Sequence, residues 1–194
     1  MTMFGRRTVF AVGLLAVGLA GCSNTEGPVS AGTTGGAPQK STISAEAEAA
    51  LQDLYATRPE ARKLADNAKA ILVFPSITKA GFGIGGLFGN GAMFEGGKTV
   101  GYYNIAGGSF GLQIGAQSFS QAYFFNTEEA LKTFREAKGF EIGAGVSAVA
   151  ADFGANGQLS TNTLQKPLVV ATWGQTGLMA GIDVSGAKIT QTNP

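Results

Sequence analysis

The stretch Ser109-Phe-Gly-Leu-Gln-Ile-Gly-Ala-Gln-Ser118 carries the clearest secondary-structure pattern in this chain. Its apolar positions are Phe110, Leu112, Ile114 and Ala116, and small or polar residues stand between them. Successive side chains of a β-strand point to opposite faces, so strict alternation places the apolar ones together on one face. The stretch therefore predicts a β-strand that is buried on one face only.

Similar apolar or alternating runs lie on both sides of this stretch. They are Ile71–Phe74, Thr99–Ile105, Glu141–Asp152, Leu168–Trp173 and Leu178–Val184. Glycine recurs inside such runs, where it usually marks a bulge, a tight bend or the close approach of another backbone. The pattern predicts a strongly curved, glycine-rich, mostly antiparallel sheet.

Glycine is unevenly distributed along the chain. Of the 30 glycines, eight lie at or before Gly36 and the other 22 lie from Gly81 onward. Between them, Ser44–Tyr55 contains good helix formers behind a serine that can act as N-cap. A second run, Pro59–Ala70, places proline at a favourable first helical position. Both runs predict N-terminal helices.

One further helix is predicted within the sheet region. Asn126 is a suitable N-cap, Glu129 follows three positions later, and Gly139 is a natural stop. The fold class is therefore α+β, with N-terminal helices packed on the curved sheet and one internal helix.

The N-terminus has the parts of a bacterial lipoprotein signal peptide. Arg6-Arg7 is a short basic region, an apolar run covers residues 9–18, and Leu19-Ala-Gly-Cys22 has the form of a lipobox. The apolar run is shorter than the ~20 residues that span a bilayer. We expect residues 1–21 to be removed and Cys22, the only cysteine, to be acylated.

The expected mature chain consists of a tether and one domain. Residues 22–43 are mostly Gly, Ser, Thr, Pro and Ala, too polar to offset the entropy of ordering. Residues 44–194 are long enough for a single domain with its own core. Ser23 after the cysteine is similar to outer-membrane sorting signals of enteric bacteria. We expect a lipid-anchored protein of the bacterial cell envelope, at the outer membrane and facing the periplasm.

Composition excludes several classes of function. The chain has no histidine, and acylation would use its single cysteine, so His or Cys catalysis and His/Cys metal sites are unavailable. Removing Arg6 and Arg7 leaves 12 Lys and Arg against 13 Asp and Glu, a net charge of −1. This balance gives no basic field for nucleic acid. We therefore expect no metal, no cofactor, no nucleic-acid partner and no enzymatic activity.

Two patterns invite a catalytic or nucleotide-binding interpretation. Gly81-Phe-Gly-Ile-Gly-Gly86 fits G-x-G-x-x-G, but the residues after it do not predict the helix that would hold a pyrophosphate. We interpret it as a glycine-rich strand and turn where two segments approach closely. Carboxylates inside apolar runs, Asp152 and Asp183, are the candidates for a hydrolase, although no spacing selects a pair.

Basic residues are concentrated in the helical region. They are Arg58, Arg62, Lys63, Lys69 and Lys79. Near an anionic membrane each cation contributes about 1 kcal/mol to binding, whereas an ordinary solvated helix face has the same composition. They are our candidates for contact with lipid head groups.

Several blocks together resemble the SYLF family. They are Ala70-Ile-Leu-Val-Phe-Pro-Ser-Ile-Thr-Lys-Ala-Gly-Phe82, Gly101-Tyr-Tyr-Asn-Ile105, residues 109–119, Leu159-Ser-Thr-Asn-Thr-Leu164 and residues 177–189. The similarity covers roughly residues 45–191. Eukaryotic members bind phosphoinositides and some bind actin, so the resemblance implies a lipid-binding module. Neither ligand is normal in a bacterial envelope, which points to another anionic phospholipid.

The sequence thus leaves two main hypotheses. The first is a non-catalytic protein, held to the membrane through acylated Cys22, whose SYLF-like domain binds phospholipid or anionic lipid head groups. The alternative is a structural lipoprotein that binds an envelope protein, with lipid contact only through its acyl chains.

Overall fold

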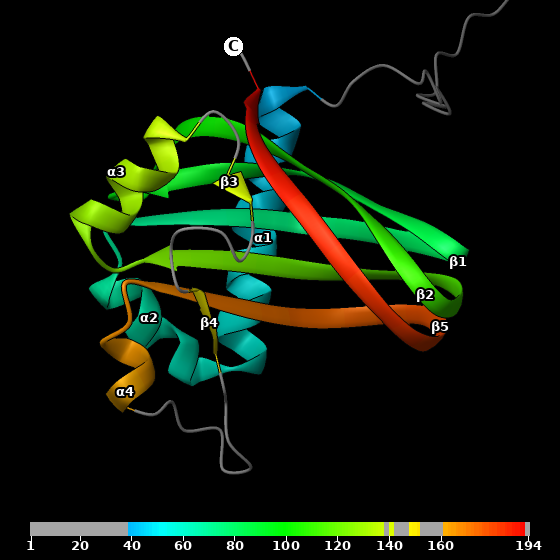
Figure 1. Ribbon diagram of the computed structural model, residues 1–194. Coiled ribbons are helices and arrows are strands. Elements are labelled where there is room, and N and C mark those ends of the chain that lie inside the picture. Colours follow the sequence, from blue (N-terminus) through cyan, green and yellow to red (C-terminus); the bar gives the residue numbers. More distant parts are fainter. Residues whose placement is uncertain (1–38, 138–139, 142–147, 152–160, 193–194) are drawn as a thin grey trace, which may run out of the picture. The chain divides into compact units, whose positions relative to one another are not determined.

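Three long β-strands dominate the described part of the chain, which comprises residues 39–137, 140–141, 148–151 and 161–192. The chain divides into two units, residues 1–36 and 37–194, and all described residues lie in the second. The elements in chain order are α1 (Lys40–Thr57), the 3₁₀ turn η1 (Pro59–Ala61), α2 (Arg62–Asn67), β1 (Ala70–Glu95), β2 (Lys98–Phe125), α3 (Glu128–Glu136), β3 (Phe140–Glu141), β4 (Ala148–Ala150), α4 (Thr161–Leu164) and β5 (Leu168–Thr192). Figure 1 shows their arrangement. Helices combined with a mostly antiparallel sheet confirm the predicted α+β class.

The sheet order is β1-β2-β5-β3, and β4 pairs in parallel with β5. β1 and β2 form one antiparallel hairpin, from Ala70 opposite Phe125 to Glu95 opposite Lys98. Its turn is Gly96-Gly97, with φ of 54° and 77°, values that glycine adopts without strain. β5 then follows β2 over nearly its whole length.

Each long strand folds back partway along its length, so the sheet doubles over (Figure 1). A straight strand of 26 residues would extend about 85 Å at ~3.3 Å per residue. In β1 the direction changes near Gly83, whose φ is 71°, and the register with β2 shifts between Phe82 and Ile84. Several shorter strands were predicted, and this prediction was wrong. Glycines let β1 bend here: the ladder with β2 is interrupted at residues 111–113 and resumes where Ile84 lies opposite Phe110.

The two halves of β1 lie against each other. A Cβ added at Gly91 would stand 2.5 Å from the carbonyl oxygen of Val73, and one at Gly89 would stand 2.8 Å from that of Ser76. At both positions only glycine leaves room for the other half of the strand. Close backbone approach, one of the reasons predicted for the glycines, is confirmed here.

Side chains alternate between two hydrophobic clusters. Leu72 and Phe74 belong to one cluster and Val73 to the other. The first cluster includes α3, whose Phe134 ring contacts Tyr103. In the second, α1 and α2 join sheet residues; α1 contributes Ile43, Ala47, Leu51, Leu54 and Tyr55. Period-two alternation therefore separates two cores, one on each face of the strands.

Two predicted helix starts were wrong. α1 begins at Lys40, so Ser44 lies inside it, and its hydroxyl is 3.0 Å from that of Tyr102. The N-cap of α3 is Thr127, whose hydroxyl accepts a hydrogen bond from the Ala130 amide. Asn126 instead donates to the carbonyl of Leu164, the last residue of α4, and to that of Lys166 just after the helix. Tertiary contacts outweigh intrinsic capping preference at both positions.

The prediction of one buried face for residues 109–118 fails at its apolar centre. Ile114 is 57% exposed, and Ala116 is exposed as well. These residues flank Gly115, whose φ is 128°, and the register of β2 with β1 shifts just before them. Of the predicted strand at residues 141–152, the structure describes Glu141 and residues 148–151.

Candidate functional site

Four of the five basic candidates lie close together in sequence and structure. Arg58 ends α1, Arg62 and Lys63 begin α2, and Lys69 directly precedes β1. All four side chains are exposed. We call Arg58, Arg62, Lys63 and Lys69 the helical basic cluster.

Aromatic and acidic neighbours orient this cluster. The Arg62 guanidinium lies 5.0 Å from the centre of the Tyr55 ring, a cation–π contact. The Lys63 ammonium lies 2.6 Å from the Glu60 carboxylate, although both groups are partly exposed. Such exposed pairs contribute about 0–1 kcal/mol. Burial raises the pKa of Tyr55 to about 12, and the charge of Arg62 offsets part of that rise. The phenol therefore stays neutral beside the cluster.

A pocket of about 320 Å³ adjoins the cluster between α1, α2 and the ends of β1. Lys69 lines it, together with Tyr55 and Phe94. Gly96 and Gly97 of the β1–β2 turn complete the lining on the strand side. We call it the helix pocket. It combines one cation, Lys69, and one carboxylate, Glu48, with aromatic and aliphatic surface.

Acidic residues moderate the charge of the helical region. Between residues 46 and 69 the sequence holds five carboxylates, against the four basic residues of the cluster. The carboxylates are Glu46, Glu48, Asp53, Glu60 and Asp66. The cluster is thus a local group of cations, and the region as a whole carries no positive excess.

Lys79, the fifth basic candidate, lies apart from the cluster. It is 9% exposed and lines a second pocket, of about 330 Å³, between the two halves of the folded sheet. Gln117 stands opposite it on β2, and Gln121 donates a hydrogen bond of 3.1 Å to Thr172. The remaining lining includes Gln175 and apolar residues such as Phe119. We call this the sheet pocket. Its amides carried no signal in the sequence, because only the folding of the strands brings them together.

The two catalytic patterns gain no support from the described residues. Gly81–Gly86 lies wholly inside β1, and the chain continues as a strand after it, which is the predicted alternative to a dinucleotide site. Asp152 lies outside the described residues, and Asp183 is placed by its backbone alone, opposite Gly111. Among the described residues, no three Asp, Glu, His or Cys side chains gather as metal ligands would.

Cys22, like all of residues 1–38, lies outside the described residues. In the described part of the chain, none of the helices combines the length and the apolar character needed to cross a bilayer.

The sequence interpretation missed a set of exposed apolar side chains at the bend of the sheet. Phe82, Ile84, Phe88 and Ile114 are 55–80% exposed. The available signal was the absence of charge, since residues 80–94 and 99–125 contain no Asp, Glu, Lys or Arg.

The second half of the chain matches a known protein family. Residues 106–194 match the family model Ysc84, described as Las17-binding protein actin regulator. The matched region includes most of β2, α3 and the whole of β5. No curated protein matches the chain.

Proposed function

We propose that this chain, whose residues 106–194 match the Ysc84 (SYLF) family model, is a non-catalytic protein that binds phospholipid. The proposal places it in the bacterial cell envelope, anchored to the outer membrane through acylated Cys22 and facing the periplasm. The lipobox at Leu19–Cys22 supports the anchor. The family description names actin regulation, a function that has no counterpart in a bacterial envelope.

The observation that carries the lipid proposal is the helical basic cluster beside the helix pocket. Four exposed cations within twelve residues can contact the phosphates of anionic head groups. At about 1 kcal/mol each they supply at most about 4 kcal/mol, which corresponds to a millimolar dissociation constant. The carboxylates nearby lower that figure. The cluster therefore gives weak, salt-sensitive binding that matters because the anchor keeps the domain near the membrane.

The anchor is tested in cells. Growing bacteria that express the full chain with a labelled palmitate analogue should yield a labelled protein that fractionates with the outer membrane. Cys22→Ser removes the only thiol and should abolish the label completely. A labelled Cys22→Ser protein, or an unlabelled parent, would contradict acylation at this residue.

Head-group binding is tested by vesicle flotation of residues 37–194, which contain all described core residues and form their own unit. We expect flotation with phosphatidylcholine–phosphatidylglycerol vesicles at low salt, weakening as salt rises. The double variant Arg62→Ala/Lys63→Ala should weaken binding about 30-fold, since it removes about 2 kcal/mol of attraction.

The matched control is Lys132→Ala/Lys188→Ala, which removes the same charge from exposed positions outside the cluster. If both double variants weaken vesicle binding equally, the effect is one of nonspecific charge, and the assignment of head-group contact to the cluster is wrong. If the parent binds no anionic vesicle, while crosslinking in cells captures one abundant protein, the protein-partner hypothesis replaces this one.

A further inference from the structure

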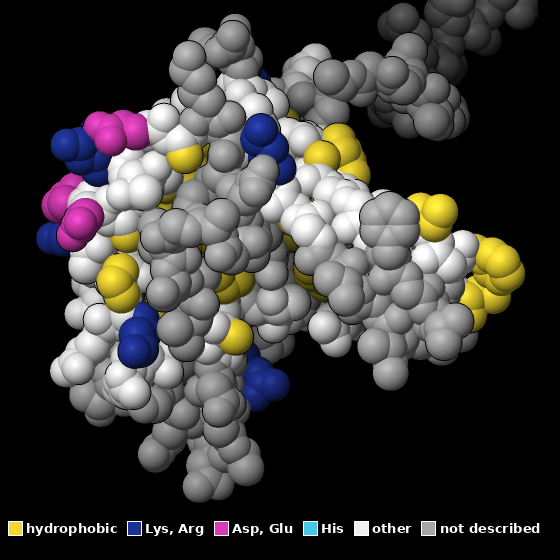
Figure 2. Space-filling view, viewed as in Figure 1, with side chains coloured by type: hydrophobic (Ala, Val, Ile, Leu, Met, Phe, Trp, Pro, Cys, Tyr) yellow, Lys and Arg dark blue, Asp and Glu magenta, His cyan; other side chains and the backbone are white. Residues whose placement is uncertain are grey.

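The bend of the folded sheet exposes large apolar side chains. Phe82 is 80% exposed, Ile84 is 68% exposed and Ile114 is 57% exposed. Phe82 and Ile114 stand directly opposite each other on β1 and β2, so they share a face. We call these three residues the sheet tip. Figure 2 shows hydrophobic side chains at this end of the sheet.

The strands that form the tip are free of charge over long distances. No Asp, Glu, Lys or Arg occurs in residues 80–94 of β1 or 99–125 of β2. A charged side chain moved toward hydrocarbon costs about 2.5–3.5 kcal/mol, so charged residues normally flank surfaces that stay in water. Monomeric soluble proteins rarely expose such apolar groups without a partner.

The backbone of the tip is paired at some positions and unpaired at others. In the central strand β2, Ile114 pairs with Phe82 on one side and Ala180 on the other. Phe110 likewise lies between Ile84 and Val184. Between these pairs, residues 111–113 of β2 have no partner on β1, and β1 is an edge strand, so the tip suits the hydrated interface rather than the hydrocarbon core.

We propose that the sheet tip inserts into the interfacial layer of a phospholipid bilayer. Three apolar side chains on the uncharged stretches of β1 and β2 match the region between head groups and acyl chains. Lys40 follows Cys22 by 18 positions, and a chain of that length spans at most about 60 Å. The anchor of the proposed function, on which this part of the argument rests, therefore keeps the tip within reach of a bilayer.

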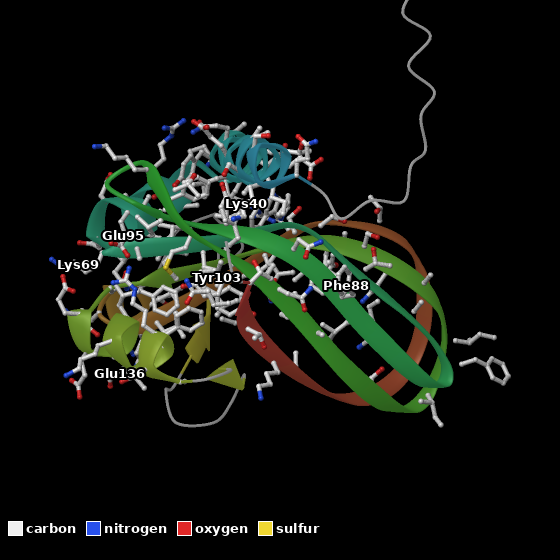
Figure 3. All side chains as sticks on the ribbon, turned by 90° about the horizontal axis from the view of Figure 1, so that it is seen from above. Lys40, Lys69, Phe88, Glu95, Tyr103 and Glu136 are labelled. Carbon is white, nitrogen blue, oxygen red and sulfur yellow. The ribbon has the colours of Figure 1, made fainter. Side chains whose placement is uncertain are left out.

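The tip and the helical basic cluster are separate membrane contacts. From Lys69 to Phe82 the chain advances 13 positions, about 40 Å along β1. In Figure 3, Lys69 lies beyond one end of the sheet, and Phe88, four residues after Ile84, lies toward the other.

The test uses residues 37–194 and vesicles of pure phosphatidylcholine, whose head groups carry no net charge. The parent should bind in a manner insensitive to salt, because the contact is apolar. Phe82→Ser/Ile84→Ser should weaken partitioning about 100-fold, roughly tenfold for each side chain withdrawn from the bilayer. Val100→Ser is the matched control: Val100 is 47% exposed but lies at the β1–β2 turn, away from the tip, and should change binding less than about twofold.

A second readout locates the inserted residue. Residues 37–194 contain no cysteine, so Ile84→Cys and Val100→Cys each offer one labelling site for an environment-sensitive fluorophore. With vesicles, the label at position 84 should brighten, shift to the blue and be quenched by lipids with brominated acyl chains. The label at position 100 should not respond.

Several outcomes would overturn the proposal. The first is that the tip variant binds vesicles as tightly as the parent. The second is that the parent does not bind phosphatidylcholine vesicles. The third is that the fluorescence of the label at position 84 does not respond to vesicles. Self-association of the parent without lipid, lost in the tip variant, would assign the tip to a second copy. If Arg62→Ala/Lys63→Ala weakens binding to anionic vesicles while Phe82→Ser/Ile84→Ser leaves vesicle binding unchanged, head-group recognition is supported and insertion is contradicted. If only the tip substitutions weaken vesicle binding, insertion is supported and head-group recognition is contradicted.

Discussion

Replacing Gly91 with alanine should lower the free energy of unfolding of residues 37–194 by about 3 kcal/mol. The new methyl group would stand 2.5 Å from the carbonyl oxygen of Val73 and 2.7 Å from the Phe74 ring. Both neighbours are fully buried, and the carbonyl belongs to the other half of the same strand. Relief of the clash requires the two halves of β1 to separate, which opens both hydrophobic clusters.

Gly86→Ala is the control for this prediction. Gly86 lies in the same strand, and a Cβ there would come no closer than 3.7 Å to the carbonyl oxygen of Gly107. Alanine at such a site changes stability by less than about 1 kcal/mol and can raise it by restricting the unfolded chain. Urea unfolding can be followed through Trp173, the only tryptophan, which is 8% exposed. Equal unfolding midpoints for the two variants would contradict close packing of the folded strand.

Replacing Phe134 with alanine should cost about 4 kcal/mol, because a large buried ring leaves a cavity. Phe134 is 3% exposed, and its ring centre lies 4.9 Å from that of Phe125 and 5.3 Å from that of Tyr103. It is the main side chain by which α3 covers the first hydrophobic cluster. The Arg135–Glu95 ion pair remains, but an exposed pair contributes at most about 1 kcal/mol.

Lys132→Ala tests whether the effect belongs to the buried face of α3. Lys132 is 73% exposed and lies 3.8 Å from Glu136 one turn later. Losing that pair should cost no more than about 0.5 kcal/mol. Calorimetry or urea unfolding of both variants gives the comparison. If Phe134→Ala were as mild as Lys132→Ala, α3 would contribute little to the core.

Much of the fold follows from local patterns. The apolar run Ile71–Phe74 correctly predicts a strand, and strand geometry then sends Leu72 and Phe74 to one core and Val73 to the other. Pro59 does open a helical turn, as expected for a residue with fixed φ and no amide hydrogen. The glycines of residues 81–86 form a strand and bend where two segments meet, as the absence of a following helix predicted.

Element boundaries were harder to predict. Ser44 and Asn126 are both good N-caps by residue type, yet each makes a tertiary hydrogen bond instead. A cap is chosen by competition between local and distant partners, and the distant ones are absent from a local pattern. For the same reason the sequence did not show that Lys69 and Lys79 belong to different sites, although the fold places them in different pockets.

The sequence by itself determined the α+β class, the helical segment before residue 70, the alternating faces and the uncharged character of the strands, because each depends on residue type and spacing. Only the tertiary structure decided that three bent strands replace several short ones. It also decided that position 91 must be glycine to leave room for the Val73 carbonyl oxygen, and that Ile114 lies uncovered. Spacing fixes which side chains share a face. Whether another element covers that face depends on where the strand bends. Contacts with distant parts of the chain determine the position of that bend.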